Sequence, residues 1–188
     1  MEAYKIAFAD DLSIFKNYKH STDNSKIMKE LKECQANLHR WGRANQVCFE
    51  TKKETMHVIS KSDPLGENFK ILACTFDVKL NMDDEIENLV KIVSWKFRLL
   101  LRSKKYYDTT DLIIEYKARV LAYMECRTAA IYHATKTRTN KVNHLQEHFI
   151  KELDVNANDA FLKHNLAPLE NRRNIAMLGM IHNRAGAP

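Results

Sequence analysis

Residues 4–16 read Tyr-Lys-Ile-Ala-Phe-Ala-Asp-Asp-Leu-Ser-Ile-Phe-Lys, with two adjacent carboxylates, Asp10 and Asp11, between two short apolar segments. Apolar side chains recur at every second position on both sides of the pair, which is the period of a β-strand. The pattern predicts a hairpin of strands 4–8 and 12–16 with both carboxylates at its tip. Because neighbouring carboxylates repel each other and Mg²⁺ prefers such oxygen ligands, this tip is a candidate metal site; a plain solvated turn is the alternative.

The next part of the chain predicts one amphipathic helix followed by short strands. Residues 21–23 offer N-caps, and the helix is expected to end near residues 42–45. Its apolar side chains share one face: Ile27, Leu31, Cys34, Leu38 and Trp41. Strands are then expected at three places, with a hairpin continuation after the last: 47–50, 55–60 and 69–76, then 77–80.

Helical spacing dominates from residue 82 onward. Asn81 is the expected cap of a helix with an acidic first turn. Its apolar stripe consists of Ile86, Leu89, Val93, Phe97 and Leu100. Further helices are expected at 110–135, 138–153, 157–164 and 169–183. A change of composition near residue 80 predicts a domain of mixed helices and strands over 1–80 and a helical domain over 81–188. The expected fold class is α+β, with a small antiparallel sheet and one packed helix ahead of a helical region.

Composition narrows the class of protein. The 188-residue chain is 45% hydrophobic with a formal net charge of +6, which favours a folded domain with a polyanionic partner such as nucleic acid. The four cysteines stand singly, which is typical of reduced thiols in an intracellular protein, in the cytoplasm or the nucleus, and indicates no zinc site. The sequence contains no apolar run of membrane-spanning length, so no membrane partner is expected.

A row of cations lies on the predicted helix opposite its apolar stripe. The side chains recur at helical spacing: Lys91, Trp95, Arg98, Arg102 and Lys105. Such a row, with one aromatic side chain, is suited to contact with a phosphate backbone, and an ordinary solvated helix face is the alternative.

Two other groups of residues are weaker candidates. Arg172 and Arg173 are possible nucleic-acid contacts, although arginines on a helix more often snorkel or pair with a carboxylate such as Glu170. His144 and His148 have a spacing that permits metal binding, but no helpful third ligand joins them, and a plain helix surface is favoured.

The segment Phe8-Ala9-Asp10-Asp11 resembles the [Tyr/Phe]-x-Asp-Asp motif of reverse transcriptases, and later segments follow in that family's order. The first of these are Leu38-His39-Arg40-Trp41, Val47-Cys48-Phe49, Lys53 and Met56-His57-Val58-Ile59-Ser60. The segment 69–77 is similar to the primer grip, and the basic helical region after Leu80 is similar to the thumb. The last segments resemble the post-thumb region of non-LTR retrotransposon polymerases: Glu115-Tyr116-Lys117, Ala130-Ile131-Tyr132-His133, Asn165-Leu166-Ala167-Pro168-Leu169, Arg172-Arg173 and Met177-Leu178-Gly179.

The resemblance implies an RNA-directed DNA polymerase, which is a nucleotidyltransferase that binds RNA and DNA as a primer–template duplex. It implies a partial palm over 1–80 and a thumb and post-thumb region over 81–188. It implies that Asp10 is the direct ligand of Mg²⁺ or Mn²⁺ and that Asp11 is the adjacent carboxylate. It places Lys53 near the incoming nucleotide. The residues that it implies for the primer end are Ile71, Leu72 and Ala73.

Three departures from the family's pattern change these expectations. Ala73 stands where the family usually has glycine, so close approach of the backbone to the primer is expected to be hindered or to follow another path. Glu54 follows Lys53 and is expected to pair with it. In the family the fingers and a third metal-binding aspartate precede the hairpin, so we expect an incomplete metal site, an inactive isolated chain and an upstream polymerase fragment as partner. The alternative function is a non-catalytic, basic nucleic-acid-binding module derived from such a polymerase.

Overall fold

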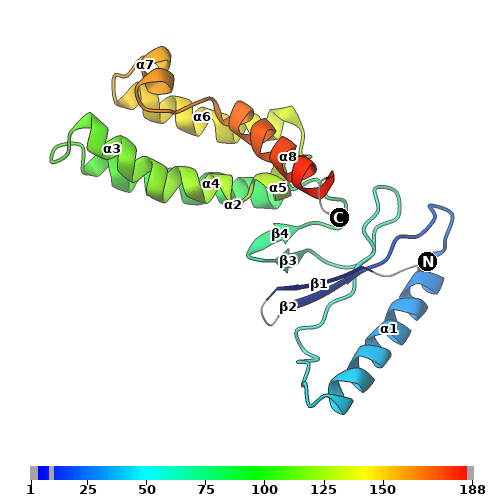
Figure 1. The fold of residues 1–188 in the computed structure, drawn as a ribbon. Helices are drawn as coiled ribbons and strands as arrows, with labels where there is room; N and C mark the ends of the chain where they lie inside the picture. The colour runs from blue at the N-terminus through cyan, green and yellow to red at the C-terminus, as the bar shows by residue number, and fades with distance from the viewer. Residues whose placement is uncertain (1–3, 9–10, 186–188) are drawn as a thin grey trace. The chain divides into compact units, whose positions relative to one another are not determined.

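The structure, a computed structural model, describes residues 4–8 and 11–185 and combines helices with two small antiparallel sheets of two strands each. It divides into two compact units, Met1–Glu67 and Asn68–Pro188, called the N-terminal and C-terminal units below (Figure 1). The α+β fold class is confirmed in this coarse form. None of the helices in the described ranges is long and apolar enough to cross a membrane.

The N-terminal unit begins with the predicted hairpin. Strands β1 (Tyr4–Phe8) and β2 (Asp11–Phe15) pair antiparallel, with Phe8 opposite Asp11. Both strands are confirmed, with the second beginning at Asp11 instead of residue 12. Asp11 is therefore a paired residue of β2 and not a residue of the turn, which corrects its predicted place at the tip, and Asp10 lies outside the described residues.

Helix α1 (Asn24–Ala44) begins and ends where the sequence predicts. The carboxylate of Asp23 accepts a hydrogen bond from the backbone N–H of Ser25, which satisfies one of the free N–H groups of the first turn. Ile27 is buried, whereas Trp41 is exposed, so the predicted apolar face is covered along only part of its length. A Cβ on Gly42 would lie 2.7 Å from the carbonyl oxygen of Val47, so the return of the chain past the helix end requires glycine there.

The segment after α1 is a loop, so the predicted strands 47–50 and 55–60 are wrong. Within the described residues its β-pairing is a single bridge between Val58 and Leu65. The carboxylate of Glu54 contacts two side chains of α1, which holds the segment against the helix. The error arises because local apolar alternation indicates a strand without indicating what the segment packs against.

The C-terminal unit also begins with a hairpin, formed by β3 (Phe69–Ile71) and β4 (Cys74–Phe76). The prediction of a single strand over 69–76 is therefore wrong. The chain turns at Leu72 and Ala73, whose φ angles are +47° and +65°. Neither residue type favours a positive φ, so the sequence carries no ordinary turn signal at this point.

Residues 77–80 lead into helix α2 (Asp83–Arg102) instead of forming the expected hairpin continuation. The carboxylate of Asp77 accepts hydrogen bonds from the backbone N–H groups of Lys79, at 3.0 Å, and Met82, at 2.7 Å. Met82 occupies the N-cap position in a left-handed conformation, which corrects the expected cap at Asn81. The acidic first turn of α2 is present as predicted.

The remaining helical segments complete the C-terminal unit: α3 (Thr109–Tyr116), the π-helical η1 (Lys117–Leu121), α4 (Ala122–Glu125), α5 (Thr128–Ile131), α6 (Lys136–Glu152), α7 (Ala157–Leu162) and α8 (Leu169–Ala185). The helix predicted over 110–135 is interrupted, because the chain breaks at Arg127 where that side chain turns toward α2. The three later predicted helices are confirmed with small differences at their ends.

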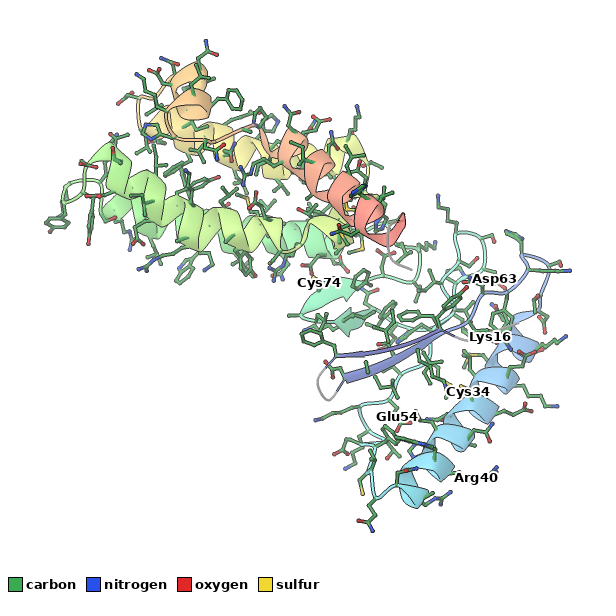
Figure 2. The ribbon with its side chains drawn as sticks, viewed as in Figure 1. Lys16, Cys34, Arg40, Glu54, Asp63 and Cys74 are labelled. Atoms are coloured by element: carbon green, nitrogen blue, oxygen red, sulfur yellow. The ribbon has the colours of Figure 1, made fainter. Side chains whose placement is uncertain are left out.

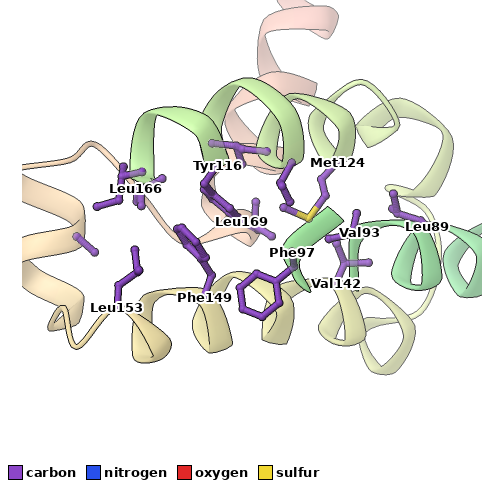
Figure 3. Close-up of a cluster of buried hydrophobic side chains, with 14 of the residues drawn as sticks. Leu89, Val93, Phe97, Tyr116, Met124, Val142, Phe149, Leu153, Leu166 and Leu169 are labelled. Carbon is purple, nitrogen blue, oxygen red and sulfur yellow. The ribbon is translucent and has the colours of Figure 1, made fainter. Parts of the chain in front are cut away.

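The core of the C-terminal unit is built from apolar side chains of α2, α3, α6 and neighbouring segments (Figure 3). The predicted stripe of α2 faces this core, with Leu100 partly buried and four residues buried: Ile86, Leu89, Val93 and Phe97. The rings of Tyr116 and Phe149 stack with their centroids 4.0 Å apart. Since both rings are buried, this stack is a rigid link between α3 and α6.

A buried ion pair attaches the β3–β4 hairpin to the helices. Nε of Arg127 donates to one carboxylate oxygen of Glu85 at 3.0 Å, and the other oxygen accepts from the backbone N–H of Thr75 in β4 at 2.9 Å. The guanidinium also lies over the ring of Tyr123, 3.9 Å from its centroid. These contacts explain why the compact units divide ahead of this hairpin and not at the composition change near residue 80.

Candidate functional site

The first hairpin presents a carboxylate beside an apolar face. Asp11 is exposed at the start of β2, directly opposite Phe8. Residues opposite each other point to the same face of a sheet, so Asp11 shares a face with the exposed side chains of Tyr4, Ile6 and Phe8. Across residues 4–8 and 11–185, the structure contains no group of three or more histidine, cysteine, aspartate or glutamate side chains that could hold a metal ion.

Lys53 lies exposed in a turn of the N-terminal unit, where its backbone N–H donates to the carbonyl of Glu50 at 2.9 Å. The expected pairing of Glu54 with Lys53 is wrong. Glu54 points to α1 instead (Figure 2), where it accepts a hydrogen bond from Gln35 and lies 2.8 Å from Nε2 of His39. The hydrogen bond with His39, and then that with Gln35, lowers the pKa of Glu54, so this carboxylate belongs to the fold and leaves the Lys53 ammonium exposed.

The predicted primer-contact residues form the turn of the β3–β4 hairpin. Ile71 is half-buried and opposite Cys74, whereas Leu72 and Ala73 are exposed at the turn. Both turn residues have positive φ, the pattern of the type I′ turns that join tight hairpins. Glycine is favoured in this conformation, and Ala73 is the position where the resembled family usually has glycine.

Replacing Ala73 by glycine is expected to stabilise the C-terminal unit by about 0.5–1 kcal/mol. Relief of the left-handed strain contributes roughly 1–2 kcal/mol, and the greater freedom of glycine in the unfolded chain offsets about 0.4–1 kcal/mol of it. Urea unfolding followed by far-ultraviolet circular dichroism measures the change.

Ala176→Gly on the exposed side of α8 is the matched control for Ala73→Gly. The same substitution there should destabilise by about 1 kcal/mol, because glycine in a helix interior has only the entropic cost. Equal destabilisation by both variants would contradict the strained turn.

The predicted basic face is exposed from Lys91 to the end of α2 and just beyond it. All five of its side chains are exposed: Lys91, Trp95, Arg98, Arg102 and Lys105. Lys105 follows the helix end, and Trp95 has 57% of its surface exposed. From Lys91 to Arg102 the helix rises about 16 Å, which matches about five successive phosphates on one strand of a duplex.

The ion pairs of the described residues use other cations. Within the C-terminal unit, Glu87 is 3.8 Å from Lys141, and Glu85 is paired with Arg127. Lys91, Arg98, Arg102 and Lys105 have no ion-pair partner among the described side chains. The positive charge of this face is therefore available to an external anion.

The weaker candidates take part in the fold. Arg172 pairs with Glu125, and Arg173 is buried and donates to Asn143 at 2.6 Å, with burial lowering its pKa. His144 lies 2.8 Å from a carboxylate oxygen of Glu147. These contacts give Arg172 and Arg173 structural partners, and the described residues form no metal group at the histidines.

A pair of exposed tyrosines was not predicted from the sequence. Tyr106 and Tyr107 are exposed in the connection between α2 and α3, immediately after Lys104 and Lys105. The available signal for these tyrosines was the run Lys-Lys-Tyr-Tyr ahead of Asp108, the N-cap of α3. The run repeats with neither the helical nor the strand period, so the periodic pattern did not indicate it.

No protein-family model, curated protein or solved structure matches this chain.

Proposed function

We propose that this chain is part of an RNA-directed DNA polymerase, the reverse-transcriptase domain of a non-LTR type of retrotransposon, and that it binds a primer–template duplex of RNA and DNA. The exposed, unpaired cations of the basic face on α2 are the observation that carries the binding part of the proposal. The ordered motifs that begin at Phe8-Ala9-Asp10-Asp11 support the polymerase part.

In this proposal each unit has a separate role. The hairpin β1–β2 and α1 belong to the palm, and the β3–β4 turn at Leu72 and Ala73 contacts the primer end. The helices from α2 onward are the thumb and the region after it. Phosphate contacts from α2 hold the duplex without reading its sequence, since a polymerase must bind every template.

The carboxylates fit the metal that the resemblance implies. Asp10 and Asp11 offer hard oxygen ligands of the kind that Mg²⁺ or Mn²⁺ takes, and such ions, when bound, stabilise the charge that develops in phosphoryl transfer. Lys53 is exposed and unpaired by Glu54, which leaves its ammonium free for a nucleotide phosphate.

A second candidate function is a basic nucleic-acid-binding module without catalysis. The observation that favours it is the location of the basic face, which lies in the C-terminal unit with a core of its own and includes no residue of the carboxylate hairpin. Binding by this module would be independent of divalent ions.

Replacing Asp10 and Asp11 together by alanine distinguishes the two functions. If the pair holds metal for the duplex, the Mg²⁺ dependence of RNA–DNA hybrid binding should disappear in the double variant. Fluorescence anisotropy at constant ionic strength, with and without Mg²⁺, measures it.

The matched control for this pair is Glu33→Ala with Glu50→Ala, which removes the same charge from exposed positions of the same unit. Wild-type affinity that is indifferent to Mg²⁺, with affinity equal or higher in the Asp10 and Asp11 variant, would favour the non-catalytic module.

A further inference from the structure

The connection between α2 and α3, residues 103–108, lies at the end of the helical unit that is away from the β3–β4 hairpin (Figure 1). It presents two adjacent aromatic side chains to solvent: Tyr106 is 74% exposed and Tyr107 is 52% exposed. Tyrosine is enriched at binding interfaces because its ring is apolar and its hydroxyl is polar, so two neighbouring exposed tyrosines are candidate ligand contacts.

Hydrogen bonds at both ends fix the shape of this connection. The hydroxyl of Ser103 donates to the carbonyl of Leu100 at 2.6 Å, and the backbone N–H of Tyr106 donates to the carbonyl of Ser103 at 2.9 Å. On the other side, the carboxylate of Asp108 caps α3 by accepting from the N–H of Asp111 at 2.8 Å. The tyrosines therefore stand on a defined turn, so a ligand would need to order little of the backbone.

A hydrogen bond from Lys104 to the end of α6 adds to this rigidity. Nζ of Lys104 donates to the carbonyl of Glu152 at 2.5 Å and lies 3.9 Å from the carboxylate of Asp154. Lys104 therefore has partners within the chain. The neighbouring Lys105 has no ion-pair partner among the described residues and is available to bind an anion.

Positive charge lies on the α2 side of the exposed rings, whereas Asp108 follows them on the α3 side. Nζ of Lys105 is 4.7 Å from the centroid of the Tyr106 ring, and the basic face of α2 leads along the helix to Arg102 and then to this turn. Cations interleaved with open aromatic faces are what single-stranded nucleic acid requires, because its phosphates need charge and its bases need a stacking surface. A protein partner is less well matched, since the centre of a protein interface is depleted of lysine.

We propose that Tyr106, Tyr107 and Lys105 form a stacking platform for single-stranded nucleic acid, which receives the unpaired strand that leaves the duplex on the basic face. This inference rests on the proposed function. The two tyrosine rings stack on two successive bases, and Lys105 contacts the phosphate that joins these bases. Since every base has a flat aromatic face, the platform accepts any sequence.

The test compares two probes, a blunt RNA–DNA hybrid and the same hybrid with a short unpaired extension of one strand. The full chain should bind the extended hybrid more tightly. In Tyr106→Leu with Tyr107→Leu this gain should fall by about 5- to 150-fold for each stacked base, while affinity for the blunt hybrid stays unchanged. Anisotropy of the labelled probes measures both affinities.

Two control variants separate stacking from loss of structure. Tyr106→Phe with Tyr107→Phe keeps the rings and should keep the gain. Tyr132→Leu with Phe161→Leu removes exposed aromatic side chains elsewhere in the same unit and should also keep it.

The possible outcomes distinguish this inference from the proposed function. If the leucine variant keeps the full gain from the extension while the blunt hybrid still binds, the platform is overturned, a protein surface becomes the better use of the tyrosines, and duplex binding stands. If the wild-type chain binds single strands through the tyrosines but binds no hybrid, the proposed function is overturned and the platform stands.

Discussion

Replacing Arg127 by methionine is expected to lower the free energy of unfolding of the C-terminal unit by about 3–5 kcal/mol. The substitution leaves the carboxylate of Glu85, whose side chain is fully buried, with the backbone N–H of Thr75 and without its cation. The cost arises from the uncompensated charge and not from lost apolar contact, because methionine fills much of the same volume. Urea unfolding monitored by circular dichroism measures it.

The double variant Glu85→Gln with Arg127→Met is the control for Arg127→Met. Glutamine removes the buried charge and keeps an oxygen that accepts from Thr75, so most of the lost stability should return. The sequence contains two tryptophans, one in each unit. In a Trp41→Phe background, the fluorescence of Trp95 therefore monitors unfolding of the C-terminal unit alone. A loss below about 1 kcal/mol for Arg127→Met would show that the pair does not hold the hairpin to α2.

The second large effect is expected on the basic face of α2. Replacing Lys91, Arg98 and Arg102 together by glutamine should weaken hybrid binding for every sequence. If each side chain contacts one phosphate, the log–log dependence of the binding constant on salt should become shallower by about 2.7, at about 0.9 for each phosphate of a B-form duplex. Glutamine keeps a long side chain with good helix propensity, and all three positions are exposed, so the fold should be unaffected.

The matched control moves the same charge change to other exposed positions of the same unit. Lys79→Gln, Lys136→Gln and Lys151→Gln remove three cations that lie outside the α2 row. Because phosphate contacts are local, this variant should keep most of the wild-type salt dependence. An equal reduction in both triple variants would assign the binding to net charge and not to a defined face.

Helical periodicity allowed much of the C-terminal unit to be predicted from the sequence. The stripe that includes Leu89 and Val93 is buried as its spacing indicates, and the opposite face carries exposed cations. Both results follow from local geometry, since side chains three and four residues apart share one face of a helix. Helix α1 was predicted from the same spacing, and its N-cap Asp23 is among the capping residues that the sequence offers at 21–23.

The errors lie where distant contacts decide the structure. The segment around Glu54 alternates like a strand but is held by side chains of α1, and the helix predicted over 110–135 breaks so that Arg127 reaches Glu85. The turn at Leu72 and Ala73 was invisible because it lacks glycine or asparagine. None of these contacts has a signal in neighbouring residues.

The candidate site divides in the same way. The cations of α2 repeat with the helix and were predicted, whereas Tyr106 and Tyr107 lie in a connection without a period and were missed. Asp11 was identified correctly as part of a hairpin, but its place in the paired strand depends on the exact register with Phe8. Register depends on pairing across the turn, which an apolar pattern specifies less precisely than it specifies the strand itself.

The most direct test of the central claim is the affinity of the full chain for an RNA–DNA hybrid as salt is varied. Binding through the basic face predicts that the logarithm of the binding constant falls linearly with the logarithm of salt concentration, with a slope that corresponds to several phosphate contacts and becomes shallower in the α2 triple variant. A binding constant that stays flat as salt increases, or no binding at low salt, would contradict the claim.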